Sequence, residues 1–287
     1  MMKSYTEELI YTEAEDGIIL AGLFILPAVE PEKPEVVIWI PGGSINFYHP
    51  SFIPIGRELA GLGYAFLIGN TRGHDLGANL WWKVESGERM DRRAGGALWE
   101  RFEESPLDVA AWIDRAGLRG FQKVALVGHS FGGLKVVYYQ VQRQDPRLVG
   151  LILASAAIGL PPRKPELVAQ AEQMVADGRG EELMPWGSFD WTVKTMSAQT
   201  YLSWHRIPDL FGKHTPDPEI GQIRCPLMVC FGTEEGYDPI EDIELIQRNT
   251  SGVPGIETVL FEGANHGYDN HEKEVATAIA HWINSRR

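Results

Sequence analysis

The sequence feature that most restricts the fold is an apolar run that ends in a serine flanked by glycines. Residues 124–133 read Val-Ala-Leu-Val-Gly-His-Ser-Phe-Gly-Gly, and a helical pattern follows them. This order predicts a buried strand, a tight turn with Ser130 at its apex, and a helix. A serine on such a turn has strained backbone geometry, and side chains two residues to either side would collide across it. Gly128 and Gly132 remove those collisions.

The rest of the chain alternates between apolar runs and helical spacings. Strands are expected at residues 8–12, 18–26, 36–40, 64–68, 148–154, 226–231 and 256–261, and helices at 52–62, 103–116, 240–249 and 272–285. This alternation favours an α/β fold with a mostly parallel sheet and helices on both faces. Ligands of such sheets bind outside the carboxyl ends of the strands. Residues that directly follow strands are therefore the candidates for chemistry.

Two stretches interrupt the alternation. Residues 76–102 are predicted to form a long irregular connection, and connections of that length often carry function or insertions. The second break, at about residues 159–221, contains an acidic amphipathic helix and an aromatic-rich patch. We therefore expect a core of residues 1–158 and 222–287, with residues 159–221 inserted into it.

A serine with a nucleophilic role needs two partners. A base must remove the hydroxyl proton, and a carboxylate must hold the tautomer of that base. Among the eight histidines, His266 is the best base, because it follows a predicted strand in a turn of small residues. The carboxylate should follow the preceding strand, where Glu234, Glu235 and Asp238 are available. The order serine, acid, histidine is that of a nucleophile-elbow hydrolase.

The oxyanion that forms on attack at a carbonyl needs preorganised N–H donors. The amide of Phe131, directly after the serine, is the first candidate. The second donor is expected from Gly42-Gly43-Ser44 after the strand at 36–40, where glycine lets the backbone approach a substrate. The same three residues could also form a simple turn after a strand.

These residues together resemble the α/β-hydrolase fold superfamily, in its serine esterase and lipase-like form, over nearly the whole chain. Besides the elbow, the resemblance rests on Asn70-Thr71-Arg72-Gly73-His74 and on Gly263-Ala264-Asn265-His266. It implies a mostly parallel eight-stranded sheet with helices on both faces and a small cap inserted after the sixth strand. Residues 159–221 match the position of that cap.

The chain departs from the family pattern at two places. The family often has His-Gly where this chain has Pro41-Gly42, so the second oxyanion donor stays open between Gly43 and Ser44. The family usually has an aspartate three residues after the glycine that follows strand seven. In this chain that position is Glu235. The resemblance therefore implies Glu235 as the acid of the triad, and Asp238 is the alternative.

The resemblance implies hydrolysis of a small-molecule carboxylic ester through an acyl-enzyme, with no metal or organic cofactor. Thioesterases, lactonases and amidases use the same triad, and a non-catalytic ligand-binding protein on this fold is a further alternative. Tryptophans of the two interrupting stretches are candidates for the substrate pocket, although packing between cap and core explains them equally well. They are Trp81, Trp82, Trp186, Trp191 and Trp204.

Composition limits the partners. The net charge of −13 argues against nucleic acid or an anionic membrane as the main partner. The first residues lack the apolar core of a signal peptide, and no apolar run approaches membrane-spanning length. We therefore expect a cytoplasmic protein, and the sequence leaves a homodimer open. Cys225 and Cys230 should point to opposite faces of one strand, which predicts neither a disulfide nor a metal cluster.

Overall fold

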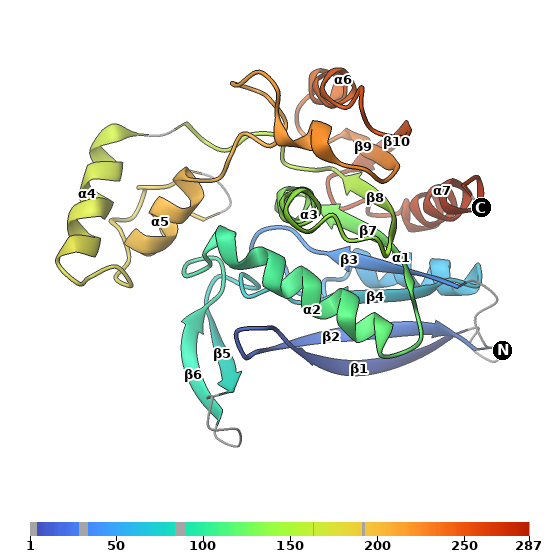
Figure 1. Ribbon diagram of the computed structural model, residues 1–287, viewed down its shortest axis with the longest axis horizontal. Helices are drawn as coiled ribbons and strands as arrows, with labels where there is room; N and C mark the ends of the chain where they lie inside the picture. Colours follow the sequence, from blue (N-terminus) through green and yellow to red (C-terminus); the bar gives the residue numbers. More distant parts are fainter. Residues whose placement is uncertain (1–4, 29–33, 84–89, 163, 191–192, 287) are drawn as a thin grey trace.

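Ten strands form one mixed sheet in the part of the chain that the structure, a computed structural model, describes (Figure 1). That part comprises residues 5–28, 34–83, 90–162, 164–190 and 193–286. The strands are β1 (Tyr5–Glu13), β2 (Ile18–Pro27), β3 (Glu35–Ile40), β4 (Ala65–Gly69), β5 (Ala78–Lys83), β6 (Met90–Gly95), β7 (Lys123–His129), β8 (Leu148–Ala154), β9 (Leu227–Glu234) and β10 (Ile256–Asn265). The helices are α1 (Phe52–Gly61), α2 (Ser105–Gly117), α3 (Phe131–Arg143), α4 (Pro165–Ala176), α5 (Ala198–His205), α6 (Ile240–Asn249) and α7 (Glu272–Asn284), with short 3₁₀ turns at Phe102–Glu104 and Glu219–Gln222.

Most of the sheet is parallel. Its strand order is β10-β9-β8-β7-β3-β4-β2-β5-β6, and β1 pairs with β2. Neighbouring strands from β10 to β4 in this order are parallel. Strand β2 pairs antiparallel with β1, β4 and β5. The expected α/β-hydrolase fold is therefore confirmed, with its eight strands extended by a hairpin of β5 and β6.

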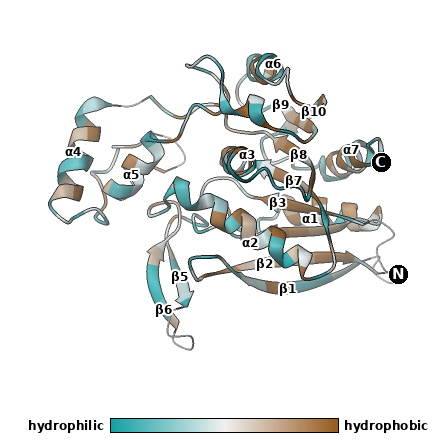
Figure 2. Cartoon of the chain, viewed as in Figure 1, coloured by the Kyte–Doolittle hydropathy of each residue, from teal (hydrophilic) through white to brown (hydrophobic). Residues whose placement is uncertain are grey.

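Helices cover both faces of the sheet because the side chains of its central strands alternate between two apolar clusters. On β3, Val36 and Ile38 pack in a cluster with α2 and α3, whereas Val37 and Trp39 pack in a cluster with α1 and α7. Every residue of β3 is buried, as expected for a strand covered on both faces. Figure 2 shows these central strands in the colours of hydrophobic residues. None of the helices in the described ranges is long and apolar enough to cross a membrane.

The expectation of an irregular connection at residues 76–102 is wrong, because this stretch contains the hairpin of β5 and β6. Trp81 on β5 is opposite Arg92 on β6, and the Arg92 guanidinium lies 5.1 Å from the centre of the Trp81 ring. Trp81 also pairs with Ile19 of β2. The stretch therefore extends the sheet beyond β2.

The segment between β8 and β9 contains α4 and α5, which pack on each other away from the helices that cover the sheet (Figure 1). Hydrogen bonds join this segment to the residues that precede α2. The amide of Ser197 donates to the Leu98 carbonyl at 2.8 Å, and the amide of Phe102 donates to the Ser203 hydroxyl at 2.8 Å. The division of the chain into a core and a cap of residues 159–221 stays a proposal.

Candidate active site

Ser130 occupies the turn between β7 and α3 and is partly exposed. Its φ of 53° and ψ of −123° lie in a region that residues with a side chain rarely adopt, at a cost of about 1–3 kcal/mol. Backbone hydrogen bonds hold the turn in this conformation. The Ser130 amide donates to the Ala154 carbonyl at 3.0 Å, and the Ala157 amide donates to the Ser130 carbonyl at 3.0 Å. The strained turn expected from the sequence is therefore confirmed.

Glycine is required on both sides of this turn. A Cβ on Gly128 would lie 2.5 Å from the carbonyl oxygen of Gly132 and 2.5 Å from Cγ2 of Val136. A Cβ on Gly132 would lie 2.3 Å from the carbonyl oxygen of Ile40. All three distances are far below van der Waals contact, so the two glycines allow β7, α3 and the end of β3 to meet at the serine.

The turn after β3 passes beside the serine. A Cβ on Gly42 would lie 2.9 Å from the Cβ of Ser130, and one on Gly43 would lie 3.6 Å from the Cβ of Phe131. Ser44 continues the turn with a φ of 57°. Phe131 is the first residue of α3, and the N–H groups of a first helical turn point out of the helix end. The structure thus gathers the expected oxyanion residues at Ser130, and their roles as donors are proposals.

His266 and Glu235 form a close pair at the ends of β10 and β9. Nδ1 of His266 lies 2.6 Å from Oε2 of Glu235. The Glu235 side chain is fully buried, whereas that of His266 is 47% exposed. Because a carboxylate can only accept, Nδ1 carries the proton and Nε2 is left to accept one. Strands β7 to β10 are parallel neighbours. Ser130, Glu235 and His266 therefore all lie at the carboxyl ends of strands, on the same side of the sheet.

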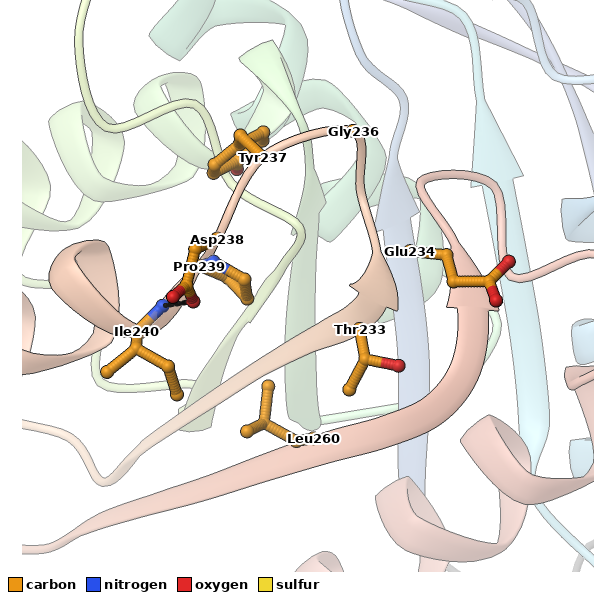
Figure 3. A pocket seen from close by; sticks show the side chains of 8 residues that line it. All are labelled: Thr233, Glu234, Gly236, Tyr237, Asp238, Pro239, Ile240 and Leu260. Atoms are coloured by element: carbon orange, nitrogen blue, oxygen red, sulfur yellow. Dashed lines mark hydrogen bonds between the residues drawn. The ribbon is translucent and has the colours of Figure 1, made fainter.

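Asp238, the alternative acid, makes a different interaction. Its Oδ1 accepts a hydrogen bond from the amide of Ile240 at 3.0 Å, at the beginning of α6. Figure 3 shows this bond at the wall of an open pocket beside β10, together with Glu234 at the exposed end of β9. This pocket contains neither Ser130 nor His266. Of the carboxylates considered, Glu235 is thus the one that contacts His266.

Several donors surround the Glu235 carboxylate. The Ser155 hydroxyl donates to its Oε1 at 2.5 Å, and the Gly232 amide donates to the same oxygen at 2.9 Å. Burial alone would raise the pKa of Glu235, but the hydrogen bonds from His266, Ser155 and Gly232 outweigh burial and lower it below its ordinary value. The carboxylate is therefore ionised near neutral pH.

Tyr268 supports Ser155 from the buried side. The Tyr268 hydroxyl oxygen lies 2.7 Å from the Ser155 hydroxyl oxygen and 3.1 Å from the Cys230 carbonyl oxygen. Because Ser155 donates its own proton to Glu235, the contact with Ser155 is a hydrogen bond when Tyr268 donates to it. Burial raises the pKa of Tyr268 well above its usual range, so its hydroxyl keeps the proton. Neither residue is among the site residues predicted from the sequence. The signal for Ser155 was its place directly after β8, between the strands that lead to Ser130 and Glu235.

His129 fixes the backbone of His266. Its Nε2 lies 2.7 Å from the His266 carbonyl oxygen, so Nε2 carries the proton and donates it. Its ring packs against Trp39 and Phe52. Burial, followed by the nearby charge of His266, lowers the pKa of His129 to about 3. His129 therefore stays neutral at physiological pH and acts as a hydrogen-bond donor to the His266 turn.

Ser155→Ala tests the support of Glu235. We expect kcat/KM for an ester substrate to fall about tenfold at neutral pH, because a hydrogen bond to a buried charged group is lost. The variant also raises the pKa of Glu235, so on acidification its carboxylate is protonated at a higher pH than in the wild type. In a carbon-13 NMR titration of the glutamate side chains, the Glu235 carboxyl signal should change at a higher pH in the variant than in the wild type.

Ser105→Ala is the matched control for this variant. Ser105 is a fully buried serine on α2, and its hydroxyl has no hydrogen-bond partner among the described residues. We expect this variant to keep the wild-type titration of Glu235. An unshifted Glu235 titration in Ser155→Ala would show that the Ser155 hydroxyl does not act through Glu235.

The structure places the candidate pocket tryptophans in different environments. Trp204 is buried, and its ring stacks on that of Phe131 with 4.2 Å between ring centres. Trp81 and Trp82 lie on the β5–β6 hairpin, and Trp186 is 80% exposed. Trp191 lies outside the described residues. Trp204 is therefore the one of the four described tryptophans that contacts the elbow.

No group of three or more His, Cys, Asp or Glu side chains in the described ranges is arranged to hold a metal ion. Ser130, Glu235 and His266 follow the parallel neighbours β7, β9 and β10 at the carboxyl end of the sheet, and Ser155 and Gly232 donate to Glu235. The groups of this site can accept a proton from a hydroxyl, stabilise the resulting imidazolium and donate hydrogen bonds to an oxyanion.

Comparison with known proteins gives relatives of the same fold. Residues 37–278 match the alpha/beta hydrolase family. The phospholipase YtpA of Bacillus subtilis (strain 168) is 41% identical over 75 residues, which are 26% of this chain and 28% of that protein. The chain thus matches little more than a quarter of the length of this curated relative.

Among solved structures, Est1E from Butyrivibrio proteoclasticus with bound ferulic acid has a TM-score of 0.65 and 18% identity, covering 96% of this chain and 98% of its own. The esterase Pf2001 of Pyrococcus furiosus has a TM-score of 0.61 and 16% identity, covering 98% and 91%. DcsB in complex with its substrate analogue has a TM-score of 0.71 and 14% identity, covering 98% and 99%. These likenesses show a shared fold.

Proposed function

The chain belongs to the alpha/beta hydrolase family, and on that premise we propose that it hydrolyses small-molecule carboxylic esters with a triad of Ser130, His266 and Glu235. The observation that carries the proposal is the 2.6 Å contact between His266 Nδ1 and Glu235 Oε2, at the sheet edge where Ser130 stands on its strained turn. Structural neighbours named as esterases favour an ester over other acyl compounds.

The mechanism follows from the roles of these groups. His266 Nε2 accepts the proton of the Ser130 hydroxyl as the serine oxygen attacks the ester carbonyl. The amide of Phe131 and that of Gly43 or Ser44 donate to the oxyanion. His266 then protonates the leaving alcohol, and an acyl-enzyme remains. His266 next removes a proton from water, which attacks the acyl group. The imidazolium then returns that proton to the Ser130 oxygen as the acid is released, and Glu235 stabilises the imidazolium at both stages.

The Ser130–His266–Glu235 triad also serves thioesters, lactones and amides, and these remain the alternatives within acyl hydrolysis. A ligand-binding protein without turnover is the alternative from a different class. The buried and ionised Glu235 favours catalysis, because its hydrogen bonds serve to orient a partly exposed histidine.

The test of the proposed function is pre-steady-state hydrolysis of p-nitrophenyl esters with acyl chains of two to twelve carbons. We expect a burst of p-nitrophenol equal to the enzyme concentration whenever deacylation is slower than acylation, because the acyl-enzyme accumulates. Intact-protein mass spectrometry of the quenched reaction should show one acyl group per chain. If the protein hydrolysed none of these esters and none of the matched thioesters, the proposed hydrolysis would be contradicted and the ligand-binding alternative would be favoured.

A further inference from the structure

A cavity of about 470 Å³ lies between the end of β8 and the segment that follows α5. Much of its wall is apolar. The large apolar side chains that line it are Leu134, Ile158, Leu160, Trp204, Ile207 and Leu210. A cavity of this size holds part of a small ligand.

The cavity adjoins the candidate active site through residues that hold the elbow. Leu134 lies in the first turn of α3, one turn beyond the serine. Trp204 stacks on Phe131, the proposed oxyanion donor. Ile158 directly follows Ala157, whose amide donates to the Ser130 carbonyl. A substrate whose carbonyl reaches Ser130 could therefore extend one arm into the cavity.

Positively charged side chains line part of this cavity, although the net charge of the chain is −13. Two cations, Arg206 and Lys213, line it, and within the described residues neither of their side chains forms an ion pair or a hydrogen bond. The Lys213 side chain lies across Gly159, where a Cβ would be 3.1 Å from its Cδ and 3.4 Å from its Nζ.

Among the residues that the structure describes, neither of the nearby acids forms an ion pair with Arg206 or Lys213. Both carboxylate oxygens of Asp209 accept hydrogen bonds within its own loop, from the amides of residues 212 to 215 and from the Thr215 hydroxyl. Asp242 is close enough for the charge of Lys213 to act on it, but burial is the larger influence and raises the pKa of Asp242. The cations are thus available to a ligand.

We propose that this cavity is a subsite for esters that carry an anionic group, a carboxylate or a phosphate, separated from the ester carbonyl by an apolar segment. The apolar segment packs along Leu134, Ile158 and Trp204, and the anionic group lies at Arg206 and Lys213. This inference rests on the proposed ester hydrolysis and names the class of substrate.

Two matched substrate pairs test the subsite. The first compares the p-nitrophenyl monoester of adipic acid with p-nitrophenyl hexanoate, so that the anionic group is on the acyl side. The second compares 6-(phosphonooxy)hexyl butyrate with hexyl butyrate, so that the anionic group is on the alcohol side and is separated from the ester by an apolar chain. We expect the wild type to prefer the anionic member of one pair by about two- to fivefold in kcat/KM, the range that exposed ion pairs support.

Variants connect this preference to the cations. In Arg206→Met/Lys213→Met the preference should disappear through a higher KM for the anionic substrate, while hydrolysis of the neutral member is kept. Lys213→Arg should retain the preference. Lys123→Met is the matched control, since Lys123 is an exposed lysine at the opposite end of β7 from Ser130.

The outcomes separate the two proposals. Equal kcat/KM for both members of both pairs, or a preference that survives in the double methionine variant, would overturn the anionic subsite while leaving ester hydrolysis intact. A different result would contradict the proposed ester hydrolysis itself: Ser130→Ala would hydrolyse the neutral esters at the wild-type rate.

Discussion

Ser130→Ala is expected to lower kcat for p-nitrophenyl ester hydrolysis by about 10⁴- to 10⁶-fold, the range measured when a serine nucleophile is removed from such a triad. Alanine has no oxygen to attack the carbonyl, so no acyl-enzyme can form. Steady-state hydrolysis with a short-chain ester measures the loss. KM should change little, because the substrate contacts remain.

The fold should tolerate this change. Alanine bears the same backbone strain as serine at a φ of 53°, so the melting temperature should stay close to that of the wild type. Ser105→Ala, at a buried serine on α2, is the control for serine removal and should keep full activity. Comparable kcat values for Ser130→Ala and the wild type would contradict the assignment of the nucleophile.

Glu235→Gln is expected to lower kcat by about 10³- to 10⁴-fold. The amide has nearly the same shape as the carboxylate but no charge, so it neither holds the Nδ1–H tautomer of His266 nor stabilises the imidazolium. Asp238→Asn is the matched control, because Asp238 contacts the beginning of α6 and should lose less than twofold. If only Asp238→Asn lowered kcat by orders of magnitude, the acid would be Asp238.

Glu235 also makes the free energy of unfolding depend on pH in the acidic range. Its pKa in the folded protein is below the value in the unfolded chain, because hydrogen bonds to the carboxylate outweigh burial. The carboxylate therefore contributes stability above its unfolded pKa, and this contribution is lost as pH falls through its folded pKa. Glu235→Gln lacks this contribution, so the stability difference between wild type and variant should shrink on acidification.

The sequence was most informative where local chemistry and fold agree. The elbow could be predicted because Gly128 and Gly132 are needed at steric contacts with Val136 and Ile40, and such requirements leave a mark in the sequence. His266 and Glu235 could be placed because each follows its own apolar strand. The parallel sheet then brings the ends of those strands together, which spacing along the chain does not show.

Other features depend on long-range packing that the sequence does not encode locally. The β5–β6 hairpin is mostly exposed, so its strands lack the apolar alternation that identifies β2. Ser155 and Tyr268 are 113 residues apart, yet their hydroxyls meet beside Glu235. The bond from His129 to the His266 carbonyl, 137 residues further on, likewise depends on the fold.

The central claim is that Ser130 is an activated nucleophile, and covalent labelling tests it most directly. The wild type is treated with a fluorophosphonate, and the intact mass and proteolytic peptides are measured in parallel with Ser130→Ala and Glu235→Gln. We predict one phosphonyl group per chain on Ser130, none on the alanine variant, and much slower labelling of the glutamine variant. An unlabelled Ser130 in the wild type, or equal labelling of all three proteins at another residue, would contradict the account.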